Sequence, residues 1–78
     1  LLGEQSNKNA SRNPHMEQVY QLIEQRRLKE LSDYFEQEEV QRDSEIQAFI
    51  GTLYNDGLIF ERDYLKTAVW WEKAALNG

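Results

Sequence analysis

The fold is decided by residues 44–78, SEIQAFIGTLYNDGLIFERDYLKTAVWWEKAALNG, which contain two helix patterns joined by a short loop. Ser44 and Gln47 have the spacing of a capping box, in which the Ser hydroxyl accepts from a backbone N–H and the Gln side chain reaches back to the cap. An apolar face with helical spacing follows and is made of Ile46, Phe49, Ile50, Leu53 and Tyr54. Gly57, which can adopt the left-handed conformation, is predicted to end this helix.

A second helix is predicted after Asp63, which is a good N-cap residue. Its apolar residues lead up to the Asn77-Gly78 pair and are Leu65, Ala68, Val69, Trp70, Trp71, Ala74 and Ala75. A short connection forces consecutive helices to be antiparallel neighbours. Residues 44–78 therefore predict a helical hairpin.

The preceding segment, residues 16–43, predicts two further helices. The Asn13-Pro14 pair marks a helix start, with Asn as the cap and Pro at the first helical position. One helical face is then formed by Met16, Val19, Tyr20 and Ile23. A second apolar stripe begins at Leu28, out of phase with the first. We predict a helix to about residue 25, a tight turn and a helix over 27–41, with one continuous helix as the alternative.

The chain has 78 residues, 14 acidic and 9 basic side chains, a net charge of −5 and no cysteine. This length fits one small domain. The absence of cysteine excludes a disulfide framework, a thiolate nucleophile and a cysteine-rich zinc site. The acidic balance argues against nucleic acid or an anionic membrane as a partner, because phosphate binding needs clustered Lys and Arg. No apolar run approaches the roughly 20 residues that span a bilayer, so a soluble domain is expected.

Residues 1–15 contain few apolar side chains and are rich in Asn, Ser and Gln. This composition predicts a disordered tail, either a native linker or a cloning remnant. The remaining chain divides into an N-terminal hairpin or capping helices over residues 16–43 and the hairpin of residues 44–78. The predicted fold class is therefore all-α, with about four helices in antiparallel hairpins.

Several residues of the second hairpin stand at the spacing of a known repeat: Ile50-Gly51, Tyr54, Gly57, Asp63, Trp70-Trp71, Glu72-Lys73-Ala74-Ala75 and Gly78. Residues 46–78 resemble one Sel-one-like repeat (SLR), a tetratricopeptide-like (TPR-like) helical hairpin. The sequence departs from the family pattern at three positions, where the family usually has Ala, Gly and Ala: Ile46, Ile59 and Thr67. The resemblance implies a TPR-like α-solenoid fragment that acts as an adaptor or scaffold, most often in bacterial signalling, envelope and host-contact proteins.

Glycine inside a helix costs about 1 kcal/mol relative to alanine, so Gly51 needs a compensating contact. We expect its bare Cα to let the second helix of the hairpin approach, with Ala74 or Ala75 as the small counterpart and Trp70 filling the space beside them. The residues assigned to this scaffold are Ile50, Gly51, Tyr54, Gly57, Trp70, Ala74 and Ala75.

The sequence contains no recognisable catalytic, metal-binding or cofactor-binding constellation, so neither an enzyme activity nor a cofactor is predicted. His15 is the only histidine and has no suitably spaced nucleophile or base, and we expect it to be solvated. The densest acidic residues lack the glycine and the spacing of a calcium loop and predict a solvated polar face: Asp33, Glu36, Glu38, Glu39 and Asp43.

A single hairpin repeat cannot bury both of its faces, so the last helix is expected to expose apolar surface. The candidates for this open face are Val69, Trp71 and Leu76, and core packing between the two helices is the alternative for Trp71. A second set of partner contacts is expected on the inner surface formed by the first helix of the hairpin. The predicted partner-binding residues are Gln47, Phe49, Thr52, Leu53, Asp56 and Trp71.

The sequence therefore predicts a non-catalytic protein-interaction module. Its partner would be another protein, a neighbouring repeat or a second copy, in the bacterial cytoplasm or periplasm. One alternative is a small acidic inhibitor or immunity-type protein that neutralises a basic partner through residues 30–43, and another is the end cap of a longer repeat array. Added salt should weaken acidic recognition steeply and apolar recognition little.

Overall fold

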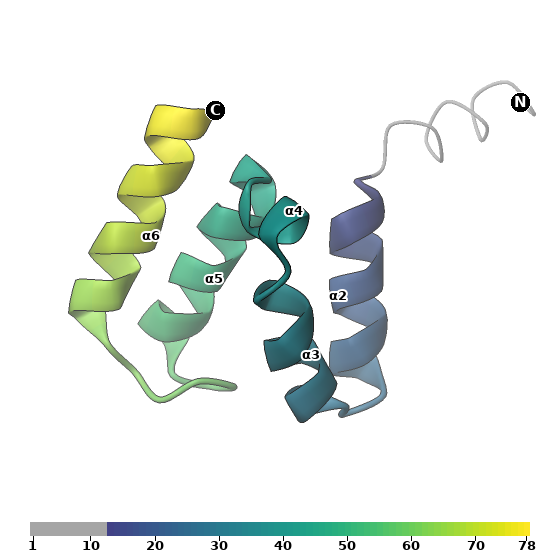
Figure 1. Cartoon of the computed structure of the whole chain (residues 1–78). Coiled ribbons are helices and arrows are strands. Elements are labelled where there is room, and N and C mark those ends of the chain that lie inside the picture. Colours follow the sequence, from purple (N-terminus) through teal and green to yellow (C-terminus); the bar gives the residue numbers. More distant parts are fainter. Residues whose placement is uncertain (1–12) are drawn as a thin grey trace, which may run out of the picture.

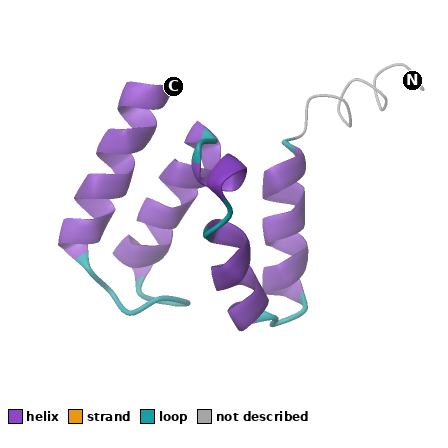
Figure 2. Cartoon of the chain, viewed as in Figure 1, coloured by secondary structure: helices purple, strands orange, loops and turns teal. Residues whose placement is uncertain are grey.

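The computed structural model describes residues 13–78, and all regular structure within them is helical. The helices are α2 (Pro14–Glu24), α3 (Leu28–Phe35), α4 (Glu38–Gln41), α5 (Ser44–Asp56) and α6 (Tyr64–Asn77). They lie side by side, with α2 and α6 at the two ends of the row (Figure 1). Loops and turns connect them (Figure 2). The predicted all-α fold of antiparallel hairpins is confirmed, with five helices in this part of the chain rather than about four.

The tail predicted over residues 1–15 is wrong at its last three residues, because Asn13 caps α2 and Pro14 and His15 belong to that helix. Residues 1–12 lie outside the described part of the chain. Asn13 is the N-cap, and its side chain accepts from the backbone N–H groups of His15 and Met16. Pro14 takes the first helical position, where its missing N–H leaves no bond unmade. The predicted helix start is confirmed.

The turn between α2 and α3 is built without glycine. Arg26 has φ +61°, in the left-handed region that glycine usually occupies after a helix. Its N–H donates to the carbonyl of Ile23 at 3.0 Å, and the N–H of Arg27 donates to the carbonyl of Leu22 at 2.9 Å. These are the two bonds of a Schellman motif. The prediction of two helices is confirmed here, and one continuous helix is excluded.

Glycine at position 26 is expected to stabilise the protein by about 1 kcal/mol. A residue with a Cβ costs about 1–2 kcal/mol in the left-handed region, and the greater freedom of glycine in the unfolded chain offsets part of this gain. Urea unfolding followed by circular dichroism measures the difference. The control Arg26→Ala keeps the Cβ and should stay within about 0.5 kcal/mol of the wild type. Equal stability of the Gly and Ala variants would contradict this backbone assignment.

The predicted helix over residues 27–41 is wrong in its second half, because α3 ends at Phe35 and α4 begins only at Glu38. The residue before α4 has extended backbone. An uninterrupted helix would carry charged side chains onto the face that buries Leu31. With the break, Val40 of α4 turns inward and is almost fully buried.

Asp43 caps α5, so the predicted capping box of Ser44 and Gln47 is wrong. The carboxylate Oδ1 of Asp43 accepts from the N–H of Ile46 at 3.0 Å. A carboxylate suits this position better than a hydroxyl, because its negative charge also interacts favourably with the helix dipole. The Gln47 side chain instead donates to the carbonyl of Gln41 at 2.7 Å.

Asn13 connects the beginnings of α2 and α5. While its Oδ1 caps α2, its Nδ2 donates to both carboxylate oxygens of Asp43, at 3.1 and 3.0 Å. The same Nδ2 donates to Oε1 of Glu45 at 3.0 Å. The cap of one helix thus holds the cap of the other.

The Asn13→Asp variant is expected to lose about 1–3 kcal/mol of stability, although Asn and Asp are equally good N-caps. The new carboxylate cannot donate and would lie against the carboxylates of Asp43 and Glu45. Chemical denaturation measures the loss. The exchange Asn13→Asp with Asp43→Asn restores a donor and should recover most of it. An Asn13→Asp variant as stable as the wild type would rule out this connection.

The hydrophobic core lies among the first four of these helices. Its buried members are Met16, Val19, Leu22, Leu31, Phe35, Val40, Ile46, Ile50 and Leu53. Among the described residues, no side chain of α6 belongs to this buried set, although Trp70 packs against it. Helix α6 is therefore an outer helix, and α5 is its principal neighbour.

Candidate functional site

The indole that fills the space at Gly51 is that of Trp71, and not that of Trp70 as predicted, although Trp70 also packs against the core. A Cβ placed on Gly51 would lie only 2.6 Å from Nε1 of Trp71, so the bare Cα makes room for the indole. The Trp71 Nε1 donates to the carbonyl of Ala48 at 3.1 Å. Adjacent helical residues point about 100° apart, which is why one of the two tryptophans meets Gly51 and the other does not.

Of the other predicted scaffold residues, some pack within the fold or end a helix and one is exposed to solvent. Ile50 is buried, Tyr54 packs its ring against Phe60 at 5.1 Å between centroids, and Gly57 ends α5 with φ +70°. Ala74 is half-buried, but Ala75 is exposed. Ala75 was therefore wrongly predicted as a counterpart of Gly51.

No residue of the described part of the chain covers the side of α6 that faces away from α5. Four exposed residues form a row along it, here called the outer stripe: Leu65, Val69, Glu72 and Leu76. Leu65 is 81% exposed, Val69 50% and Leu76 83%. Their spacing of four, three and four residues is the heptad pattern of a helix that packs along another helix. Val69 and Leu76 were predicted on the open face, and Leu65, which was not predicted there, lies at the same helical spacing.

Trp71 was also predicted on the open face, but it lies on the other side of α6. It is 45% exposed while its indole packs at Gly51. The alternative interpretation of Trp71, packing between the two helices of the hairpin, is the one that the structure supports. Trp71 therefore attaches α6 and does not belong to the outer stripe.

Two pairs of exposed residues flank the outer stripe, each pair seven residues apart. On one side is the alanine edge, Ala68 and Ala75, and on the other is the lysine edge, Lys66 and Lys73. The two ammonium groups lie 5.2 and 4.4 Å from the centroids of aromatic rings. Among the residues that the structure describes, neither lysine forms an ion pair with a carboxylate. The lysine edge thus offers two positive charges that contact aromatic rings and that no carboxylate of the described residues pairs with.

The predicted inner surface of α5 divides into buried and accessible residues. Gln47 and Leu53 are buried, so the prediction that they contact a partner is wrong. Helical periodicity turns both toward the interior because they follow Ile46 and Ile50 around the buried side of α5. Phe49 and Thr52 are half-buried and Asp56 is exposed, so these three remain accessible.

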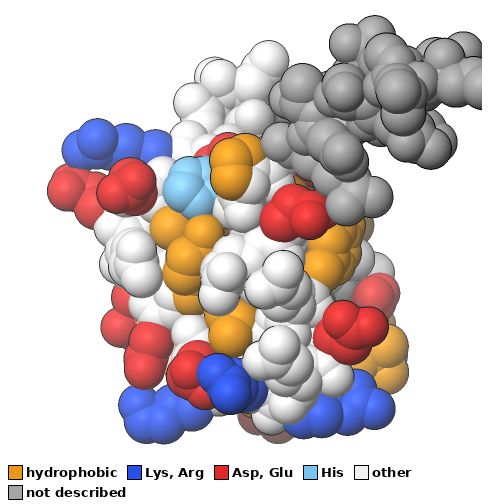
Figure 3. Space-filling model, turned by 90° about the vertical axis from the view of Figure 1, so that its right-hand side faces the viewer, with side chains coloured by type: hydrophobic (Ala, Val, Ile, Leu, Met, Phe, Trp, Pro, Cys, Tyr) orange, Lys and Arg blue, Asp and Glu red, His pale blue; other side chains and the backbone are white. Residues whose placement is uncertain are grey.

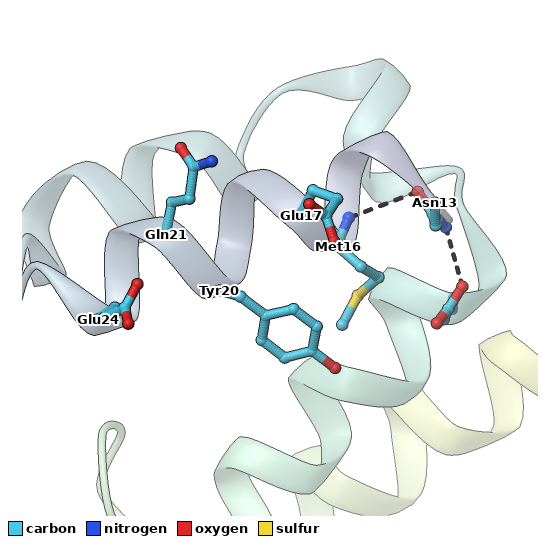
Figure 4. Close-up of a pocket in the computed structure, with 7 residues that line it drawn as sticks. Asn13, Met16, Glu17, Tyr20, Gln21 and Glu24 are labelled. Atoms are coloured by element: carbon cyan, nitrogen blue, oxygen red, sulfur yellow. Dashed lines mark hydrogen bonds between the residues drawn. The ribbon is translucent and has the colours of Figure 1, made fainter. Parts of the chain in front are cut away.

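A groove of about 540 Å³ lies between α2 and the start of α5. It is lined by Asn13, Met16, Glu17, Tyr20, Gln21, Glu24 and Glu45. Tyr20 points from α2 toward α5 (Figure 4), where its ring meets Phe49 edge-on with 5.9 Å between centroids. Three glutamates and an exposed tyrosine make this groove acidic and partly aromatic.

The acidic segment around α3 and α4 was predicted as a solvated face. Two of the five predicted acids form exposed ion pairs with nearby bases, Lys29–Asp33 and Arg42–Glu38, and the preceding Glu30 pairs with Arg27. Asp43 departs from the prediction, because it caps α5 and binds Asn13. Viewed from the α2 side, acidic side chains lie among short apolar strips, and basic side chains lie mainly along the lower edge (Figure 3).

His15 is half-buried, and not solvated as predicted. Its Nδ1 lies 2.9 Å from the hydroxyl of Tyr34, a hydrogen bond that joins α2 to α3. Burial raises the pKa of the Tyr34 hydroxyl above its ordinary value of 10.0, and the charges of Glu39 and Asp43 raise this pKa further.

This raised pKa predicts a loss of stability in alkali. Above a pH of about 10 an unfolded tyrosine ionises while folded Tyr34 stays neutral, so the unfolded state is favoured as the pH rises. The contribution is fully present below that pH and is lost as the pH rises through the folded pKa. Thermal melts at increasing pH should show a shallower alkaline decline for Tyr34→Phe than for the wild type. Equal slopes would contradict the assignment.

Within residues 13–78, no three His, Asp or Glu side chains come together in a way that could hold a metal ion. No helix in this range is long and apolar enough to cross a membrane. In comparisons with known proteins, no family model, curated protein or solved structure matches the chain. The two candidate surfaces, the outer face of α6 and the acidic groove of α2, are therefore judged on their own geometry.

Proposed function

We propose that this chain is a non-catalytic protein-interaction module that binds its partner on the outer face of α6. The adaptor or scaffold type, bacterial origin and a place in the cytoplasm or periplasm follow from the Sel-one-like resemblance and belong to the same proposal. A neighbouring repeat is one form that such a partner could take.

The observation that carries the proposal is the row of exposed apolar side chains on one helix face. Leu65 and Leu76 are more than four-fifths exposed, and Val69 lies between them with half of its surface accessible. Single exposed leucines are ordinary, but three exposed apolar side chains on one helix face, interrupted only by Glu72, favour an interaction surface. Because α6 carries apolar residues on both sides, it has the pattern of a helix that is covered on both sides.

The acidic alternative is better placed at the groove of α2 than at residues 30–43. The acids of α3 and α4 are largely engaged with nearby bases. Glu24 faces a groove beside the exposed ring of Tyr20, and Glu45, which accepts a hydrogen bond from Asn13, lines the same groove. This groove favours a basic segment as a second candidate partner. Binding there should weaken strongly with added salt.

Affinity capture with two matched variants tests the proposed function. Leu65→Glu places a charge in the outer stripe, and Leu58→Glu places the same charge at a loop leucine that is equally exposed, at 85% against 81%. Both variants should keep the helical circular dichroism spectrum of the wild type. The partner recovered by the wild type from an extract of the source cells should be lost, at least about tenfold, with Leu65→Glu only. Equal recovery by all three proteins, or recovery of no partner, would contradict the proposal.

A further inference from the structure

We infer that the outer face of α6 takes a single amphipathic helix of another protein, with acidic residues along its flanks. The inference rests on the proposed function, because it names the kind of partner that the same face would bind. It is carried by the arrangement of the outer stripe and of the two edges beside it.

The shape of the face fits one helix. The outer stripe follows the four-three-four spacing that a second helix matches side chain by side chain when it packs along the first. The alanine edge presents two small side chains, bordered by the exposed rings of Tyr64 and Trp71, so a partner helix can approach closely at the two alanines. Interaxial distances of about 8–10 Å depend on the size of the side chains at the contact, and alanine allows the smaller values.

The charges on this face of α6 favour acidic residues on the flanks of the partner helix. Helix α6 carries Lys66 and Lys73 against Glu72, a net of 2 − 1 = +1, whereas the whole chain carries −5. The lysine edge has no carboxylate partner in the described part of the chain, and aromatic rings position its ammonium groups. Acidic residues one heptad apart on a partner helix would pair with both lysines. The acidic surface elsewhere would repel the same helix, so charge also directs it to α6.

Glu72 sets a further requirement, because it lies within the outer stripe between Val69 and Leu76. A carboxylate covered by a partner needs a donor or a positive charge opposite it. The matching helix therefore carries one lysine, arginine or amide in its otherwise apolar seam.

A second copy of this chain fits the face poorly. In a two-fold antiparallel pair each edge meets the same edge of the other copy, which brings the lysine edges together. In a two-fold parallel pair the two copies of Glu72 meet at the same level of the seam. Both arrangements place like charges in contact, and the opposite charges of an acidic-flanked helix avoid this.

Two synthetic peptides three heptads long provide the test. Both have a leucine seam with one central lysine, and their flanking positions are all glutamate in one peptide and all lysine in the other. Binding to the full chain is measured by calorimetry at about 0.15 M salt, where the Debye length of about 8 Å screens the more distant acids. The Glu-flanked peptide should bind at least about tenfold more tightly than the Lys-flanked peptide.

Charge-reversal variants distinguish the effect of the lysine edge on peptide binding from the effect of the protein's net charge. Lys66→Glu with Lys73→Glu should reverse the preference, whereas the control Arg26→Glu with Lys29→Glu changes the net charge equally and should keep it. Equal binding of the peptides, no binding of the Glu-flanked peptide, reversal by the control, or self-association of the chain in place of peptide binding would overturn the inference. If Leu65→Glu abolishes partner capture while flank charge has no effect, the proposed function survives and this inference fails.

Discussion

The Gly51→Leu variant is expected to lose its cooperative thermal transition. The added side chain would occupy the volume of the Trp71 indole, because even a Cβ at this position lies 2.6 Å from Nε1. Overpacking typically costs about 1–3 kcal/mol, and separation of α6 would also lose the hydrogen bond from Trp71 to Ala48. A core in a domain of this size supplies about 3–5 kcal/mol, so the loss approaches the whole stability. Calorimetry or a circular dichroism melt measures it.

The effect of Gly51→Ala on stability should change sign when Trp71 is removed, and this makes the test specific for Trp71. With Trp71 present, Gly51→Ala should destabilise the protein, because the indole must move. With Trp71→Ala in the background, Gly51→Ala should stabilise the helix by up to about 1 kcal/mol, as it does in an open helix. Thr52→Leu, the neighbouring position on α5, serves as the volume control and should cost less than about 1 kcal/mol. The same sign in both backgrounds would contradict the close approach of α6 at Gly51.

The Leu31→Ala variant is expected to lose about 2–5 kcal/mol, enough to unfold much of the protein. Leu31 of α3 is completely buried in the core that α2, α4 and α5 complete. Its removal leaves a cavity at the junction of the two hairpins. Leu58→Ala is the matched control, since Leu58 is 85% exposed, and should change stability by no more than about 0.5 kcal/mol. Equal urea midpoints for the two variants would contradict the placement of α3 in the core.

The elements that the sequence predicts correctly are those with local signals. Asn13, Asp63 and Gly57 act at helix ends through their own side chains or backbone, so their roles are readable without the rest of the fold. The break before α4 depends on the burial of Val40, which is a tertiary effect. The turn at Arg26 uses a left-handed residue that is not glycine, so composition does not mark it.

The candidate site shows the same division. Helical spacing places Val69 and Leu76 on one face, and extending that spacing finds Leu65. The choice between Trp70 and Trp71 as the neighbour of Gly51 depends on how α6 is rotated against α5, and a sequence with apolar residues on several sides of a helix leaves that rotation open. Gln47 was predicted to be accessible to a partner. Its polar side chain is instead buried, and a hydrogen bond to the carbonyl of Gln41 in α4 satisfies its amide group.

The central claim is that a partner covers the outer face of α6 while Trp71 holds the opposite side of that helix on α5. Amide hydrogen exchange of the full chain, with and without its captured partner, tests this most directly. The claim predicts that slowed exchange is greatest in residues 65–76 of α6. Slowed exchange confined to residues 17–24, which border the acidic groove of α2, with α6 unchanged, would contradict it.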